Sequence, residues 1–169
     1  MRDQALREPI KPLIVLTPKS LLRAEVAKCS SEMLTSGTFE ITLNDAQPSA
    51  NPNKILFCSG KVYYDLQSYR NETNIKDNLI IRLEQLYPFP FDQVQAILKK
   101  YSSVKDIRWV QEEPRNMGAR TFVLPRFREV LLRSHKFRFI GRLPSASPAT
   151  GSFQVHEAEL NLLLRQAFS

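Results

Sequence analysis

The tripeptide Ser59-Gly60-Lys61 is the first candidate for chemistry, because it separates the apolar run 55–58 from Val62. A strand that turns into a helix at this point would expose the free N–H groups and the positive dipole end of the helix. A phosphate or another anion could then bind there with Lys61, and with Arg82 and Arg142 as further cations. The alternative interpretation is a tight turn in which Gly60 adopts a conformation that other residues resist.

Residues 111–118 are a second candidate, because they directly follow an apolar run that ends at Val110. Folds of the α/β class place ligands or partners on loops at the carboxyl ends of parallel strands. The carboxylates of Glu112 and Glu113 could act as acid and base or bind a metal, but adjacent strand residues point to opposite faces. We therefore favour an interface or an anchored loop over catalysis. The candidate interface residues are Glu112, Glu113, Asn116, Met117 and Arg120.

Residues 141–151 are a third candidate, since Pro144, Pro148 and several small residues suit an ordered loop that packs against another surface. The alternative interpretation is a plain connector between two elements. The sequence leaves both interpretations open.

No complete catalytic apparatus is visible in the sequence. The five glycines are too far apart for a dinucleotide-binding fingerprint or a P-loop, and no Gly-Asp-Gly occurs. His135 and His156 have no ligand partners at metal-binding spacing. We therefore assign no catalytic, cofactor-binding or metal-ligating residue.

Charge and composition indicate an ordinary globular protein rather than one that binds nucleic acid. Lys and Arg number 24 against 17 for Asp and Glu, which gives a net charge of +7. Residues 126–142 contain six basic residues and one acid, but no RNA- or DNA-reading motif accompanies them. No stretch suits a signal peptide, and none approaches the ~20 apolar residues of a membrane span. We expect a soluble protein that binds neither nucleic acid nor membranes.

Short apolar runs alternate with longer segments of helical period. Strands are predicted at 13–16, 55–58, 79–81, 107–110 and 137–140, with a half-buried edge strand at 39–43. Helices are predicted around 91–101, around 123–131 with Pro125 in the first turn, and around 160–168. This alternation implies parallel pairing with helices on both faces. We expect one domain over 1–169: a three-layer α/β/α fold with a mostly parallel sheet of about five strands, a linker at 1–10 and an exposed loop at 44–54.

Six blocks of sequence resemble, in the same order, the C-terminal region of the E1 component of 2-oxoglutarate dehydrogenase. The blocks are KPLIV at 11–15, TPKSLLR at 17–23, FCSGKVYYDL at 57–66, RLEQLYPFP at 82–90, WVQEEP with NMGA at 109–119, and GR with SASPATG at 141–151. The resemblance covers the chain from about residue 4 to its end. The family usually has Trp after the NMGA block, whereas this chain has Arg120, so a cation replaces an aromatic anchor.

This resemblance implies a transketolase-like C-terminal domain that helps to form the E1 dimer. The parent enzyme decarboxylates 2-oxoglutarate on thiamine diphosphate with Mg²⁺ and passes the succinyl group to the lipoyl arm of E2, a step of the tricarboxylic acid cycle. The cofactor motif and the principal catalytic histidines belong to other domains, so this chain alone is expected to be inactive and to hold no cofactor. Its expected partners are the remaining E1 domains, a second E1 subunit and E2. The expected location is the cytoplasm of a bacterium or the mitochondrial matrix of a eukaryote.

Two alternatives stay open at this point. One is the same domain of a 2-oxoadipate dehydrogenase E1, which shares most of these motifs. The other is a stand-alone module that binds an anionic effector, such as a nucleotide or an acyl-CoA, through Lys61, Arg82 and Arg142.

Overall fold

The computed structural model describes residues 8, 9, 11, 12 and 14–169. The chain divides into two compact units, residues 1–37 and residues 38–169. That the whole chain behaves as one domain remains a prediction. The predicted linker at 1–10 lies outside the described residues, apart from Glu8 and Pro9.

The first unit contains only short helical turns in its described part. These are η1 (Lys19–Leu21), η2 (Glu25–Ala27) and α2 (Ser31–Thr35). The predicted strand at 13–16 is wrong for residues 14–16, which form no strand, and Leu13 lies outside the described residues. Ile14 and Leu16 are 85% and 94% exposed. An apolar run between two prolines therefore resembles a strand in sequence, but no neighbouring strand pairs with residues 14–16 here.

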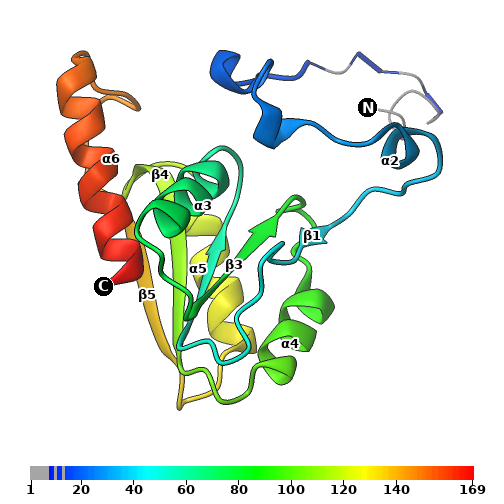
Figure 1. The fold of residues 1–169 in the computed structure, drawn as a ribbon, viewed down its shortest axis with the longest axis vertical. Coiled ribbons are helices and arrows are strands. Elements are labelled where there is room, and N and C mark those ends of the chain that lie inside the picture. The colour runs from blue at the N-terminus through cyan, green and yellow to red at the C-terminus, as the bar shows by residue number, and fades with distance from the viewer. Residues whose placement is uncertain (1–7, 10, 13) are drawn as a thin grey trace. The chain divides into compact units, whose positions relative to one another are not determined.

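The second unit is built around a five-stranded sheet with the order β1-β3-β2-β4-β5 (Figure 1). The strands are β1 (Thr42–Leu43), β2 (Lys54–Cys58), β3 (Asn78–Leu83), β4 (Asp106–Pro114) and β5 (Lys136–Arg142). β1 runs antiparallel to β3, and every other pairing is parallel. The predicted edge strand at 39–43 is reduced to the two residues of β1, and Phe39 is exposed.

Helices cover both faces of the sheet, which confirms the predicted three-layer α/β/α fold. They are α3 (Val62–Glu72), α4 (Phe91–Lys100), α5 (Arg120–Val130) and α6 (Phe153–Phe168). Side chains alternate between the faces of β2: Ile55 and Phe57 contact the layer of α4 and α5, whereas Leu56 and Cys58 contact the layer of α3 and α6. A strand that is apolar on both faces is therefore buried on both sides.

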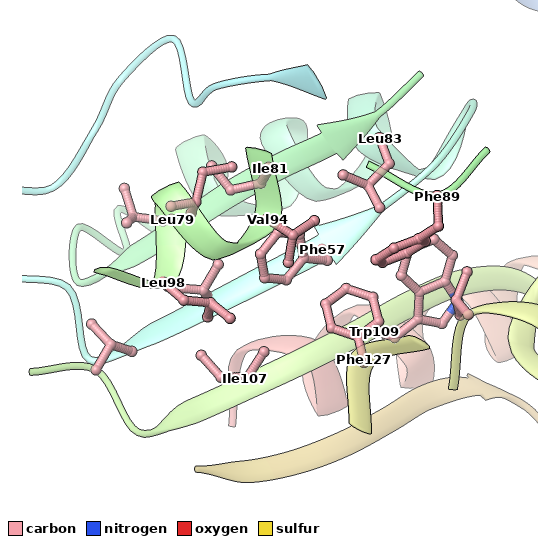
Figure 2. Close-up of a cluster of buried hydrophobic side chains, with 14 residues drawn as sticks. Phe57, Leu79, Ile81, Leu83, Phe89, Val94, Leu98, Ile107, Trp109 and Phe127 are labelled. Carbon is pink, nitrogen blue, oxygen red and sulfur yellow. The ribbon is translucent and has the colours of Figure 1, made fainter. Parts of the chain in front are cut away.

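Phe127 of α5 lies at the centre of the first apolar layer (Figure 2). Its ring centroid is 5.0 Å from that of Phe57, 5.6 Å from that of Phe89 and 6.0 Å from that of Trp109. Such tilted and edge-on contacts add to the ~1.5–3 kcal/mol that burial of a large apolar side chain contributes. This aromatic group fixes α5 against β2 and β4.

Pro125 does not lie in the first turn of its helix, as the sequence predicted. The helix begins at Arg120, so Pro125 is its sixth residue. Proline has no N–H to donate to the carbonyl oxygen four residues earlier, which belongs to Thr121. Thr121 and Pro125 are both exposed, so water can satisfy that oxygen.

The loop at 44–53 is exposed for most of its length, but it contains one buried carboxylate that the sequence pattern did not indicate. Asp45 is buried and accepts hydrogen bonds from Arg70 Nη1 at 2.5 Å, from Arg70 Nη2 at 2.9 Å and from Ile80 N at 2.8 Å. A bidentate arginine pair of this kind is strong when it is shielded from water. It ties the loop to α3 and β3.

Candidate functional site

Three of the predicted site residues lie at the carboxyl ends of neighbouring parallel strands and meet around Glu112. Lys61 comes after β2, Glu112 lies near the end of β4 and Arg142 is the last residue of β5. Glu112 Oε2 is 3.7 Å from Lys61 Nζ, and Glu112 Oε1 is 3.8 Å from Arg142 Nη2. The sheet topology thus brings together residues that are separated by 51 and 30 positions in the sequence.

Lys61 directly precedes α3 and is held by an acid of that helix. Its Nζ donates to Asp65 Oδ2 at 2.6 Å, and this i,i+4 spacing was visible in the sequence. Gly60 has a φ of +73°, the left-handed conformation that favours glycine, and nothing lies within 4 Å of a Cβ built there. The turn therefore requires glycine for its backbone conformation and not for lack of space.

Arg142 is buried, and two residues of α6 contact it. Arg142 Nη2 is 2.9 Å from His156 Nδ1, and Arg142 Nε is 3.6 Å from Glu159 Oε2. His156 Nε2 is also 4.0 Å from Glu112 Oε1. Because an arginine only donates, His156 Nδ1 must accept, which leaves the imidazole proton on Nε2, toward Glu112. Sequence reasoning missed His156 and Glu159, whose i,i+3 spacing on α6 was the available signal.

Arg82 does not join this cluster. Its Nε is 2.6 Å from Glu84 Oε1, and its Cζ lies over the rings of Tyr63 and Tyr64, at 4.5 Å and 5.3 Å from their centroids. Burial alone would lower the pKa of Arg82, but the hydrogen bond with Tyr64 and the charge of Glu84 outweigh burial and raise it. Arg82 therefore anchors the first turn of α3 from β3.

The cations around Glu112 are already paired with carboxylates of the protein itself. Lys61 and Arg142 are within 4 Å of three carboxylates, those of Asp65, Glu112 and Glu159. An incoming phosphate would have to displace one of these pairs. Anion binding through Lys61, Arg82 and Arg142 stays a prediction.

The predicted interface residues lie at the end of β4 (Glu112 and Glu113), in the loop that follows it (Asn116 and Met117) and at the start of α5 (Arg120). A buried amide holds this loop in place. Gln111 Oε1 accepts from Trp109 Nε1 at 3.0 Å, while Gln111 Nε2 donates to Met117 O at 2.7 Å. Gly118, at φ +65°, lies so close that a Cβ would be 2.8 Å from Gln111 Nε2. The hydrogen bonds of Gln111 thus connect the core to the turn at 114–118.

Around this turn, the side chains of Glu113 and Asn116 are exposed, and those of Met117 and Arg120 are half-buried. Asn116 hydrogen-bonds the backbone of Ser145, so it joins this turn to the loop at 143–152. Arg120 Cζ lies 5.1 Å from the centroid of the Phe139 ring, where the cation stacks on β5. All four residues therefore lie at the same end of the sheet as the Glu112 cluster.

Apolar side chains are exposed at this carboxyl end of the sheet. Tyr87, in the connection after β3, is 81% exposed; Leu143, directly after β5, is 83% exposed; and Phe153, the first residue of α6, is 73% exposed. Single exposed apolar residues are common, but two at the ends of one ordered polar loop, Leu143 and Phe153, are typical of a contact surface.

Within the part of the chain that the structure describes, no three His, Cys, Asp or Glu residues are grouped so that they could hold a metal ion. The described helices also include none that is long and apolar enough to cross a membrane.

Comparison with known proteins gives a consistent result over the whole chain. A sequence model of a family described as 2-oxoglutarate dehydrogenase C-terminal matches residues 28–168. The chain is 42% identical to proteins named 2-oxoglutarate dehydrogenase E1 component from Cupriavidus necator and from Haemophilus influenzae; each alignment covers 100% of this chain and 18% of the relative. It is 40% identical to a probable 2-oxoadipate dehydrogenase complex component E1 homolog from Dictyostelium discoideum, over 100% of this chain and 19% of that protein. The chain thus spans about a fifth of the length of these relatives.

Proposed function

Because the chain belongs to the 2-oxoglutarate dehydrogenase C-terminal family, we propose that it is the assembly and dimerisation domain of an E1 component. The parent enzyme would decarboxylate 2-oxoglutarate oxidatively and transfer the succinyl group to the lipoyl group of E2. Its partners would be the remaining E1 domains, a second E1 subunit and E2. We place such an enzyme in the bacterial cytoplasm or, in a eukaryote, in the mitochondrial matrix.

The observation that carries this proposal is the extent of the match. The relatives cover all of this chain, yet the chain covers only 18% of their length. The residues that complete the reaction would then lie in the other parts of such an enzyme. This chain would contribute the contacts that hold those parts together.

The parent would use thiamine diphosphate with Mg²⁺, and the residues of this chain do not fit that group. The sequence has no Gly-Asp-Gly motif, and the described residues offer no cluster of metal ligands. We therefore derive no catalytic step here. On this proposal the chain alone does not decarboxylate 2-oxoglutarate.

The exposed apolar side chains at the carboxyl end of the sheet support an assembly role. Leu143 and Phe153 lie at the two ends of the ordered loop between β5 and α6, and both side chains are exposed. Interface cores are enriched in such side chains, and their burial against a partner would remove them from water. Arg120, which stacks on Phe139 of β5, lies at the same end of the sheet, and an aromatic residue there would add apolar contact area.

A domain exchange tests the proposal. We would replace the corresponding C-terminal region of the Cupriavidus necator relative with this chain and measure both sedimentation and 2-oxoglutarate-dependent reduction of an electron acceptor. We expect the chimera to form the same oligomer as the relative and to be active, whereas the relative without this region should be inactive. A chimera with this domain folded but without the oligomer would refute the assembly role.

A double variant, Leu143→Asp with Phe153→Asp, tests the exposed apolar surface in the same chimera. Both side chains are exposed in the isolated domain, so the substitutions should leave its thermal unfolding unchanged. We expect them to weaken the oligomer. Arg120→Trp should strengthen it, because tryptophan supplies more apolar contact area.

A 2-oxoadipate dehydrogenase E1 is a second candidate parent, supported by the 40% identity to the Dictyostelium discoideum homolog. The same graft in that homolog, assayed with 2-oxoadipate, tests this candidate. Activity with only one of the two hosts would identify the parent class.

A further inference from the structure

Exposed cations gather at the amino ends of the parallel strands, opposite the Glu112 cluster. Residues 99–138 include eleven basic and four acidic residues, of which Glu112, Glu113, Arg115 and Arg120 lie at the carboxyl end of the sheet. Seven of these cations are exposed and lie in or just after the last turns of α4 and α5, or just before or in the first residues of β4 and β5: Lys99, Lys100, Lys105, Arg128, Arg133, Lys136 and Arg138. Cations at helix C-termini are favoured by the helix dipole, which explains Lys99, Lys100 and Arg128 but not the other four.

A groove of about 520 Å³ runs across this end between the segments 51–53, 103–106 and 136–138. We call it the amino-end groove. Lys105, Lys136 and Arg138 line it together with Pro52, Val104 and polar residues. Lys136 N donates to Lys105 O at 2.7 Å, and Asp106 pairs with Lys136 in the sheet register, so the backbone fixes the two lysines as neighbours.

The acid in this groove is already neutralised. Asp106 accepts hydrogen bonds from Arg108 and from Arg138, so its carboxylate holds two guanidinium groups. Lys105 Nζ donates to Ser102 O at 2.8 Å, and neither Lys105 nor Lys136 has a carboxylate within ion-pair distance in the described part of the chain. The groove therefore keeps two uncompensated positive charges at its rim.

We propose that the amino-end groove binds an acidic segment of a partner protein. Two neighbouring lysines, a concave polar surface and an acid that is already paired complement the carboxylates of an extended peptide. A nucleic-acid strand is a poorer match, because the lining residues include no aromatic side chain on which a base could stack. A membrane surface is also a poorer match, because the lysines flank a concavity and not a protruding apolar face.

Fluorescence anisotropy of a labelled polyglutamate peptide on the full chain tests this proposal. The groove variant is Lys105→Glu with Lys136→Glu. Its control is Arg115→Glu with Arg165→Glu, two exposed cations elsewhere in the fold whose substitution changes the net charge equally. We expect the Kd for polyglutamate to rise about tenfold in the groove variant, equivalent to about 1.4 kcal/mol, and to change less than about twofold in the control.

Three results would overturn the proposal. The first is no binding of polyglutamate at low salt, and the second is equal weakening in the groove and control variants. The third is tighter, groove-dependent binding of either of two competing probes, oligothymidine or vesicles that contain phosphatidylserine. The melting temperatures of both variants are measured as well. If they equal that of the wild type, a loss of binding cannot be caused by a loss of fold.

Discussion

Asn116 and Ser145 hydrogen-bond to each other in both directions. Asn116 Nδ2 donates to Ser145 O at 2.8 Å, and Ser145 N donates to Asn116 Oδ1 at 3.0 Å. Residues 143–152 contain no helix or strand, so their backbone groups have no partners in a β-ladder. The side-chain amide of Asn116 satisfies the backbone groups of Ser145 instead. Together with the bond from Arg115 N to Arg142 O at 2.9 Å, it makes the loops after β4 and β5 one ordered surface.

We expect Asn116→Ala to loosen the loop at 143–152 without unfolding the domain. The side chain is exposed, so the loss of two hydrogen bonds should lower the free energy of unfolding by only about 1 kcal/mol. Hydrogen exchange at the Ser145 amide should accelerate, because that N–H loses its acceptor. Asn161→Ala, an exposed asparagine on α6, is the control; equal exchange at Ser145 in both variants would contradict the link.

Three glycine-to-alanine variants should separate backbone conformation from crowding. Gly118 has a φ of +65° and a Cβ there would lie 2.8 Å from Gln111 Nε2, so Gly118→Ala should cost about 2 kcal/mol or more. Gly60 has a positive φ but open space, so Gly60→Ala should cost about 1 kcal/mol. Gly151 has neither constraint and should tolerate alanine within about 0.5 kcal/mol. Urea unfolding measures all three, and a different rank order would refute this account.

Much of the second unit could be predicted from sequence because its strands are short, apolar on both faces and separated by amphipathic helices. Residues 55–58 and 79–81 are such strands, and each lies where the pattern indicated. Residues 14–16 have the same local pattern without a neighbouring strand, so periodicity alone could not distinguish them. Long-range pairing, which local pattern does not contain, decides between these two outcomes.

The candidate site was predictable in its location but not in its contacts. The rule that parallel strands carry functional loops at their carboxyl ends places Lys61, Glu112 and Arg142 at one end of the sheet. Which carboxylate pairs with which cation depends on the placement of α6, which brings His156 and Glu159 to Arg142. That placement follows from tertiary packing and has no local signature.

If the predicted anion site exists, Glu112→Gln should bind an anion more tightly than the wild type. This substitution removes one carboxylate from between Lys61 and Arg142, so both cations become more available to a phosphate. We expect ATP to raise the melting temperature of Glu112→Gln by more than that of the wild type, and Lys61→Ala to abolish the shift. If ATP shifts neither protein, Ser59-Gly60-Lys61 serves only as a turn in this chain.

Arg108 should be among the most sensitive positions in the chain, because it is fully buried and caps the last turn of α6. Its Nη1 donates to Gln166 O and Ala167 O, and its Nη2 donates to Ser169 O at 2.6 Å. Arg108→Met keeps the apolar stem but leaves these carbonyl oxygens without a donor. We expect a loss of about 3 kcal/mol in urea unfolding. Arg128→Met, at an exposed position of α5, should change stability by less than about 0.5 kcal/mol; similar losses for both variants would contradict this role.

Asp106 should make the domain sensitive to acid. Burial alone would raise the pKa of its carboxyl group, but hydrogen bonds from Arg108 and Arg138 outweigh burial and lower the pKa below the ordinary value of 3.8. A carboxyl whose pKa is lower in the folded state stabilises that state fully above the unfolded pKa. This contribution is lost as the pH falls through the folded pKa.

We therefore expect Asp106→Asn to cost about 2 kcal/mol at pH 7 and to flatten the fall in stability below about pH 4. Urea unfolding at a series of pH values measures both effects. Glu40→Gln is the control, since Glu40 is exposed and has no ion pair with the described residues. If Asp106→Asn is destabilised equally at pH 3 and pH 7, the carboxylate acts through packing rather than through its charge, because only a charge contribution disappears on protonation.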